Sequence, residues 1–147
     1  MQRVGAKTSI ALVLVLLLVV GPLLISVPPL TETVPPATLA DADSRFVEVE
    51  QVQIHFKEAG TGAPAFVLLH GFGASVFTWR NVMGSFAQLG RTVAYDRPAF
   101  GLTERPVRWT GANPYGDAAQ TDIAIGLLDT LHIDRAVWVA NSAGARV

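Results

Sequence analysis

The hydrophobic and polar positions divide the chain into three parts with different patterns. An almost unbroken apolar run covers residues 10–27, and a stretch rich in proline, threonine and alanine covers residues 28–44. Residues 45–147 mix apolar runs with polar turns. Only this third part has the pattern of a folded domain, because strand and helix periodicities alternate in it with turn signals.

Two kinds of strand pattern occur in the third part. Residues 46–50 and 52–58 alternate apolar and polar side chains, which is the period of half-buried strands and predicts a hairpin. His55 falls on the polar face of its strand, so we expect a solvated side chain. Residues 65–69 and 91–96 are instead continuous apolar runs, typical of strands that are covered on both faces of a parallel sheet.

The rest of the domain is predicted to contain two helices and a last strand. We expect a helix over residues 76–89, after a glycine-rich loop, and a second helix over residues 115–132, which begins at Asp117 or Thr121. The apolar run at residues 137–140 is the last strand. The order β-β-β-α-β-α-β, with its later strands buried, predicts an α/β fold.

The apolar run at the N-terminus predicts contact with a lipid bilayer. Residues 10–27 are near the lower limit for a membrane-spanning helix, about 17 to 20 residues. The alternative is a cleaved signal peptide, whose apolar core is usually only about 7 to 15 residues long. We therefore favour an uncleaved anchor. Basic side chains in residues 1–9 and acidic ones after the run place residues 1–9 in the cytoplasm and the domain outside it, beyond a linker at residues 28–44.

Composition excludes several classes of function. Eleven Lys and Arg against twelve Asp and Glu give a net charge of −1 without a basic stripe, so nucleic acid is not an expected partner. The chain has no cysteine, which rules out thiol catalysis. Its three histidines are scattered without the spacing of metal ligands, and we expect neither a metal nor a cofactor.

The last strand runs into a serine that is flanked by small residues. Ser142 follows the β-branched run closely, with Ala140 two residues before it and Gly144 two residues after it. A strand that turns sharply into a helix holds its apical residue in strained backbone angles and brings neighbouring segments close, so bulky side chains do not fit at these two positions. The pattern fits a nucleophile at the apex of such a turn, and it fits an ordinary strand end with a Ser-Ala-Gly turn equally well.

Two further loops follow buried strands. His70, Gly71, Phe72 and Gly73 come directly after the strand at residues 65–69, and glycines at such a place let backbone N–H groups point toward one position. That arrangement is what an oxyanion hole needs. Asp96 comes after the next strand, where a carboxylate usually accepts hydrogen bonds from N–H groups of its own turn.

Three segments match the markers of one superfamily in the right order. The first is the His-Gly-Phe-Gly loop after the third strand. The second is Asp-x-x-Gly-x-Gly-x-Ser at residues 96–103, in which Ala99 replaces the first glycine and Thr103 the serine. The third is Gly-x-Ser-x-Gly, in which Ala140 replaces the first glycine. From its first strand onward the chain therefore resembles an α/β-hydrolase of the His-Gly-Phe-Gly branch.

The resemblance implies roles for the residues at the matching positions. Ser142 matches the nucleophile, and the backbone N–H groups of Phe72 and Ala143 match the oxyanion donors. The resemblance gives supporting roles in the loops to His70, Gly71, Gly73, Asp96, Ala140 and Gly144. A serine in place of an aspartate implies chemistry on ester-like, thioester, amide, peroxy-acid or carbon–carbon bonds, and argues against the alkyl-enzyme route of dehalogenases and epoxide hydrolases. We expect a small-molecule substrate with an apolar acyl part.

The resemblance also shows what residues 45–147 lack. In the family the catalytic acid and histidine follow the serine, and neither occurs after Ser142. We therefore expect an incomplete α/β-hydrolase fold, with the first five strands and their helices, from a longer enzyme, and no activity from this portion alone. The alternatives are a non-catalytic protein of this fold that binds a ligand, and an inactive membrane-tethered fragment.

Overall fold

The computed structural model describes residues 5–26, 28, 31 and 33–147. The chain forms two compact units, Met1–Thr33 and Val34–Val147, and each is described here by itself.

The first unit contains one helix, α1 (Ala6–Val20), followed by a short 3-10 helix, η1 (Gly21–Leu24). The α-helix ends where Gly21 and Pro22 follow, because proline has no N–H to continue the ladder of hydrogen bonds. In the described part of the chain no helix has both the length and the apolar character needed to cross a membrane. The structure therefore does not show the continuous spanning helix expected over residues 10–27, of which Val27 lies outside the described residues.

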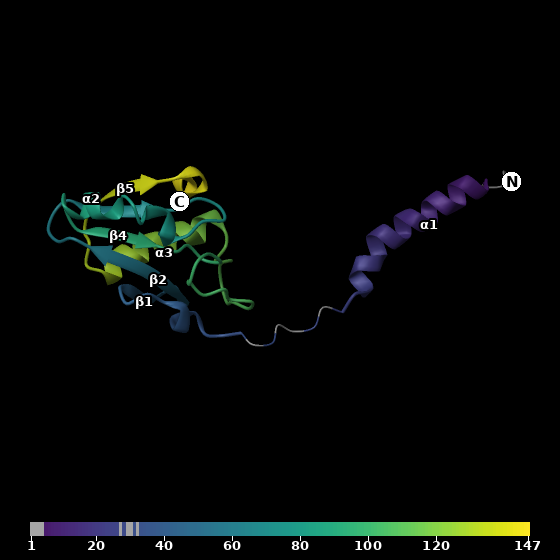
Figure 1. Ribbon diagram of the computed structural model, residues 1–147, viewed down its shortest axis with the longest axis horizontal. Coiled ribbons are helices and arrows are strands. Elements are labelled where there is room, and N and C mark those ends of the chain that lie inside the picture. The colour runs from purple at the N-terminus through teal and green to yellow at the C-terminus, as the bar shows by residue number, and fades with distance from the viewer. Residues whose placement is uncertain (1–4, 27, 29–30, 32) are drawn as a thin grey trace. The chain divides into compact units, whose positions relative to one another are not determined.

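The second unit is built on a mixed sheet of five strands (Figure 1). The strands are β1 (Ser44–Val49), β2 (Val52–Ala59), β3 (Ala65–Leu69), β4 (Thr92–Tyr95) and β5 (Ala136–Ala140). Their order across the sheet is β1-β2-β4-β3-β5. The predicted hairpin is confirmed, since β1 and β2 pair antiparallel, and β3 runs parallel to both β4 and β5.

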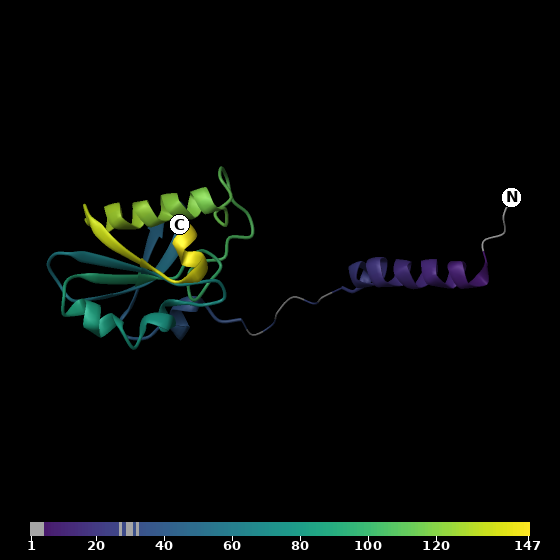
Figure 2. The same cartoon turned by 90° about the horizontal axis from the view of Figure 1, so that it is seen from above.

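Helical segments cover both faces of the sheet (Figure 2). The helix α3 (Asp117–Thr130) lies on one face, where Ile123 and Leu127 belong to the larger core cluster with β-strand side chains. On the other face, Val76 and Trp79 pack with Phe66 of β3 in a smaller cluster. All residues of β3 and β4 are buried, as predicted from their continuous apolar sequences.

The predicted helix over residues 76–89 is wrong. Two short pieces replace it, the 3-10 helix η3 (Val76–Trp79) and the five-residue α2 (Met83–Ala87). Between them the chain turns through the hydrogen bond from Val82 N–H to Trp79 O, which spans three residues rather than four. The second predicted helix is confirmed as α3, and Asp117 is its first residue.

The direction of the parallel strands decides where the loops of interest meet. Because β3, β4 and β5 run the same way, the loops after their carboxyl ends lie at one edge of the sheet. These are the loop after Leu69, the loop after Tyr95, and the turn from β5 into η4 (Ser142–Arg146). The β5 strand is the last of the described sheet, and Trp138 on it is 42% exposed.

Candidate active site

Ser142 occupies a strained turn between β5 and η4. The strand ends at Ala140, the 3-10 helix begins at Ser142, and the serine has φ +50°, in the left-handed region that favours glycine. A non-glycine residue held there costs of order 1–3 kcal/mol, and such residues concentrate at functional sites. The residue is exposed to solvent. A hydroxyl therefore stands at the apex of a sharp strand-to-helix turn.

Glycines let the turn pack against the end of β3. A Cβ atom at Gly144 would lie 2.7 Å from the carbonyl oxygens of both Leu69 and His70, closer than real Cβ contacts allow. A Cβ atom at Gly71 would lie 3.1 Å from the Cβ of Ser142. The hydrogen bond from Asn141 N–H to Leu69 O, 3.0 Å, holds the two segments together. The loop after β3 and the serine turn are thus one packed unit.

The backbone N–H groups of Phe72 and Ala143 are available for a ligand. Within the described residues neither N–H donates a hydrogen bond. Ala143 is the second residue of η4, in the first turn, where N–H groups have no partner inside the helix. The Phe72 side chain is 84% exposed and meets Phe100 edge to face, with ring centroids 5.8 Å apart.

His70 links the loop after β3 to the loop after β4. Its Nε2 accepts a hydrogen bond from the Arg97 N–H at 3.0 Å, so its Nδ1 must carry the proton that it donates to Gly71 O at 2.8 Å. Burial lowers the pKa of His70, although the Gly71 carbonyl and Asp96 oppose that effect. The ring is fully buried and neutral, and both of its nitrogens are occupied.

Asp96 organises the loop after β4. Its Oδ1 accepts a hydrogen bond from Val76 N–H at 2.7 Å, and its Oδ2 accepts one from Leu102 N–H at 2.9 Å. Burial by itself would raise the pKa of Asp96, but the hydrogen bonds from His55 and from these two amides outweigh it and lower the pKa. Gly101, at φ +49°, has no room for a Cβ because the Asp96 carboxylate fills that space.

The expectation of a solvated His55 is wrong. His55 is only 1% exposed, and its Nδ1 lies 2.7 Å from Asp96 Oδ2. The loop after β4 covers the polar face of the hairpin, since Thr103 Oγ1 accepts from His55 N–H and donates to Asp96 O. Strand alternation identifies the face on which a residue lies, but it does not tell whether a distant loop covers that face.

Sequence reasoning also missed Arg97. Its side chain is 5% exposed, and its Nη1 donates to Gln120 Oε1 at 3.2 Å and to Ala143 O at 3.3 Å. Its Nε has no partner, and within the described residues no carboxylate lies at ion-pair distance from it. Arg97 therefore brings a buried positive charge against the residue that follows Ser142. In the sequence, only its position next to Asp96 could have indicated that Arg97 belongs to the site.

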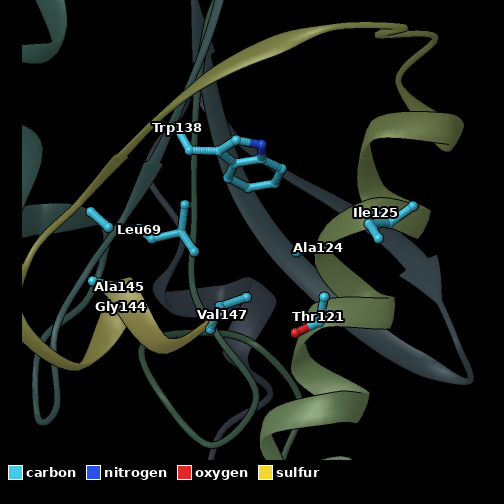
Figure 3. A pocket seen from close by; sticks show the side chains of 9 residues that line it. Leu69, Thr121, Ala124, Ile125, Trp138, Gly144, Ala145 and Val147 are labelled. Carbon is cyan, nitrogen blue, oxygen red and sulfur yellow. The ribbon is translucent and has the colours of Figure 1, made fainter.

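A cavity of about 400 Å³ lies between β5, α3 and η4 (Figure 3). Trp138 and Ile125 face it from the strand and the helix, and Val147 faces it from the end of η4. Gly144 is part of its wall but Ser142 is not. The lining of this apolar space therefore reaches the serine turn at Gly144 and Ala145 without including the serine itself.

The described residues place no base beside Ser142. The ring nitrogens of His55 lie at hydrogen-bond distance from Asp96 and Ser44. Those of His70 are bonded to Gly71 O and Arg97 N–H. His132 is exposed at the end of α3. Within the same residues no group of three His, Asp or Glu side chains is placed to hold a metal ion. The site as described consists of a nucleophile candidate, two free N–H groups and the loops that hold them.

Comparison with known proteins identifies the family of this chain. The sequence model of the family described as "Alpha/beta hydrolase family" matches residues 66–147. Epoxide hydrolase A of Mycobacterium tuberculosis is 34% identical over 105 residues, which are 70% of this chain and 32% of that protein. The 2-hydroxy-6-oxononadienedioate/2-hydroxy-6-oxononatrienedioate hydrolase of Burkholderia vietnamiensis is 36% identical over 111 residues, 70% of this chain and 37% of that protein.

The solved structures give the same result. An epoxide hydrolase from Vigna radiata superposes with a TM-score of 0.63 at 31% identity, covering 69% of this chain and 31% of that one. The chain thus spans about a third of the length of the relatives that it matches. The matched segment includes all three loops at the carboxyl ends of the parallel strands. This chain belongs to the alpha/beta hydrolase family.

Proposed function

We propose that Ser142 is the nucleophile of a serine hydrolase that cleaves an ester-like or other acyl bond. The backbone of Ser142 carries the proposal, because φ +50° holds an exposed serine at the junction of β5 and η4. Such strain costs free energy and persists where the surrounding packing enforces it. Gly71 and Gly144 supply that packing.

The two free N–H groups give the serine an electrostatic partner. When Ser142 Oγ attacks a carbonyl carbon, negative charge develops on the carbonyl oxygen, and the Phe72 and Ala143 N–H groups are the proposed donors to it. Removing one such donor typically costs about 10²–10³ in kcat. The buried guanidinium of Arg97 donates a hydrogen bond to Ala143 O. It therefore brings a positive charge close to the residue that follows Ser142.

Activation of the hydroxyl needs a base. In this family the acid and the histidine follow the serine in sequence, and the chain spans about a third of the length of the relatives that it matches. We propose that residues 45–147 do not activate Ser142 by themselves. His70 is not the base in this proposal, because both of its nitrogens already have partners.

The identity of the nucleophile selects among the activities of the relatives. Their names include epoxide hydrolases and hydrolases of unsaturated oxo acids. A serine forms an acyl ester that water can cleave, which suits a carbonyl substrate. We therefore propose hydrolysis at a carbonyl group, with the exposed Phe72 beside the apolar part of the substrate.

Turnover by the protein isolated from its own cells tests this proposal. We expect hydrolysis of p-nitrophenyl acyl esters and none of styrene oxide, and we expect the Ser142→Ala variant to have lower ester turnover. Ser75→Ala serves as the matched control, because Ser75 is neither the proposed nucleophile nor a proposed oxyanion donor. We expect this variant to retain ester turnover. Epoxide opening that survives in Ser142→Ala would contradict the proposal.

A further inference from the structure

A second serine in the chain has hydrogen-bond partners that Ser142 does not have among the described residues. Ser44 Oγ lies 2.8 Å from His55 Nε2, and His55 Nδ1 lies 2.7 Å from Asp96 Oδ2. The three side chains thus stand in the order hydroxyl, imidazole, carboxylate. We propose that Ser44, His55 and Asp96 form a separate Ser–His–Asp site, in which Ser44 accepts an acyl group from small uncharged esters.

The hairpin places two of these residues on one face. Ser44 pairs with Lys57 across β1 and β2, and His55 is two residues before Lys57 on β2. Side chains of directly paired residues, and those two apart on a strand, share a face of the sheet. Asp96 reaches the same face from the loop after β4 because its own N–H donates to His55 O at 2.9 Å.

The hydrogen bonds assign the protons. Asp96 is an acceptor, since burial is outweighed by hydrogen bonds that lower its pKa and Leu102 N–H already donates to Oδ2. His55 Nδ1 must then be the donor to that oxygen, and in this tautomer Nε2 accepts from the Ser44 hydroxyl. This is the protonation pattern of a serine that is ready to give up its proton.

The site is open to a small molecule. A cavity of about 430 Å³ is lined by Ser44, His55 and Asp96 together with Lys57. The Lys57 ammonium donates to Asp41 at 2.6 Å and to Asp43 at 2.7 Å, which leaves one of its three N–H groups for the oxygen of a bound ester. The two carboxylates at the same rim disfavour anionic substrates, so the proposed substrates are uncharged.

The three side chains can carry a complete cycle of ester hydrolysis. Ser44 Oγ bonds to the ester carbonyl carbon while its proton moves to His55 Nε2, and the imidazolium rests against Asp96. The bond from carbon to the alkoxide breaks, and the alkoxide leaves as an alcohol with that proton. Water then attacks the acyl-Ser44, gives its proton to His55, and releases the carboxylic acid with the serine restored.

Fluorophosphonate labelling of the full chain with Ser142→Ala tests the proposal. We expect one label, on the peptide that contains Ser44, and we expect it to disappear when Ser44→Ala is added. His55→Gln in the same background should slow labelling about 10²–10⁴-fold, the range of general-base catalysis. A folded Ser142→Ala chain that takes no label at Ser44 overturns the proposal. That result leaves the role of Ser142 unaffected, because this variant has no hydroxyl at position 142.

A second measurement does not depend on acyl transfer. The chain has no cysteine, so Ser44→Cys and Ser75→Cys each introduce a single thiol. Ser75 lines the same cavity, but its Oγ accepts from Phe77 N–H and makes no hydrogen bond with a histidine among the described residues. We expect iodoacetamide at pH 6.5 to alkylate Cys at position 44 at least about 10-fold faster, since a neighbouring histidine raises the thiolate fraction. Equal rates, or a rate at position 44 that His55→Gln leaves unchanged, would contradict the proposal.

Discussion

Gly71 lies so close to Ser142 that a Cβ atom on the glycine would stand 3.1 Å from the Cβ of the serine. The loop after β3 and the turn after β5 therefore cannot move independently. Since the Phe72 N–H follows Gly71 directly, the same contact fixes the distance between a proposed oxyanion donor and the proposed nucleophile. Pre-organisation of this kind, rather than a large pocket, is what the described residues contribute to the proposed mechanism.

Gly144→Ala should destabilise the domain. The new Cβ would meet two backbone carbonyl oxygens at 2.7 Å, and backbone atoms in a sheet cannot yield as a flexible side chain can. We expect a loss of about 1–3 kcal/mol in the free energy of unfolding, measured by urea denaturation. Gly84→Ala is the matched control, because nothing lies within 4 Å of its Cβ position in α2, and it should be neutral or gain up to about 1 kcal/mol. Equal effects of the two variants would contradict the packing described for the serine turn.

Replacing a strained residue by glycine should stabilise the protein. Ala99 has φ +73° in the loop where the family motif has glycine, and Ser142 has φ +50°. Because a side chain costs roughly 1–2 kcal/mol in the left-handed region, Ala99→Gly and Ser142→Gly should each add about 1 kcal/mol to the free energy of unfolding. Ala87→Gly in α2 should instead lose about 0.5–1 kcal/mol. A loss of stability in Ala99→Gly would show that the loop does not hold this strain.

Asp96 should make the domain sensitive to acid. Its pKa in the folded state lies below the ordinary 3.8, so the unfolded chain binds a proton more readily and stability falls as pH drops through this range. We expect Asp96→Asn to be about 2–3 kcal/mol less stable than the parent at pH 7, because a charged acceptor of three hydrogen bonds is lost. The difference should shrink between pH 5 and pH 3, as measured by denaturation at each pH. A difference that does not change with pH would mean that the Asp96 charge contributes nothing.

His70 should add a second pH dependence near neutrality. Burial lowers the folded-state pKa of His70 below the ordinary 6.5. The contribution of neutral His70 to the free energy of unfolding is therefore complete above pH 6.5 and declines as the pH falls below 6.5. His70→Gln keeps an acceptor for Arg97 N–H and removes the titrating group. We expect this variant to show a smaller loss of stability than the parent between pH 7.5 and pH 5. His132→Gln, a change at an exposed residue, should leave the parent profile as it is.

The sequence predicted the features that depend on local periodicity and on motif order. The hairpin, the buried strands and the helix α3 follow from the spacing of apolar residues, and the turn at Ser142 follows from its small neighbours. The prediction for residues 76–89 failed because periodicity does not distinguish one long helix from two short turns that interrupt it.

Features that depend on distant segments were not predictable. His55 is buried only because the loop after β4 folds back over the hairpin, some 40 residues later in the chain. Arg97 is buried without a carboxylate partner among the described residues, and the residues next to it in the sequence do not predict that burial. The alternation of apolar residues and the spacing of motifs predict local structure, whereas tertiary packing determines the positions of these two side chains.

Mapping the residue labelled by a fluorophosphonate tests the central claim most directly. The protein is labelled in lysates of its own cells, isolated and digested, and the modified residue is located by mass spectrometry. We predict a label on the peptide that contains Ser142, and its loss when the chromosomal gene carries Ser142→Ala. An active protein whose Ser142 stays unmodified, or whose esterase activity in a Ser44→Ala background survives Ser142→Ala, would contradict the assignment of Ser142 as the nucleophile.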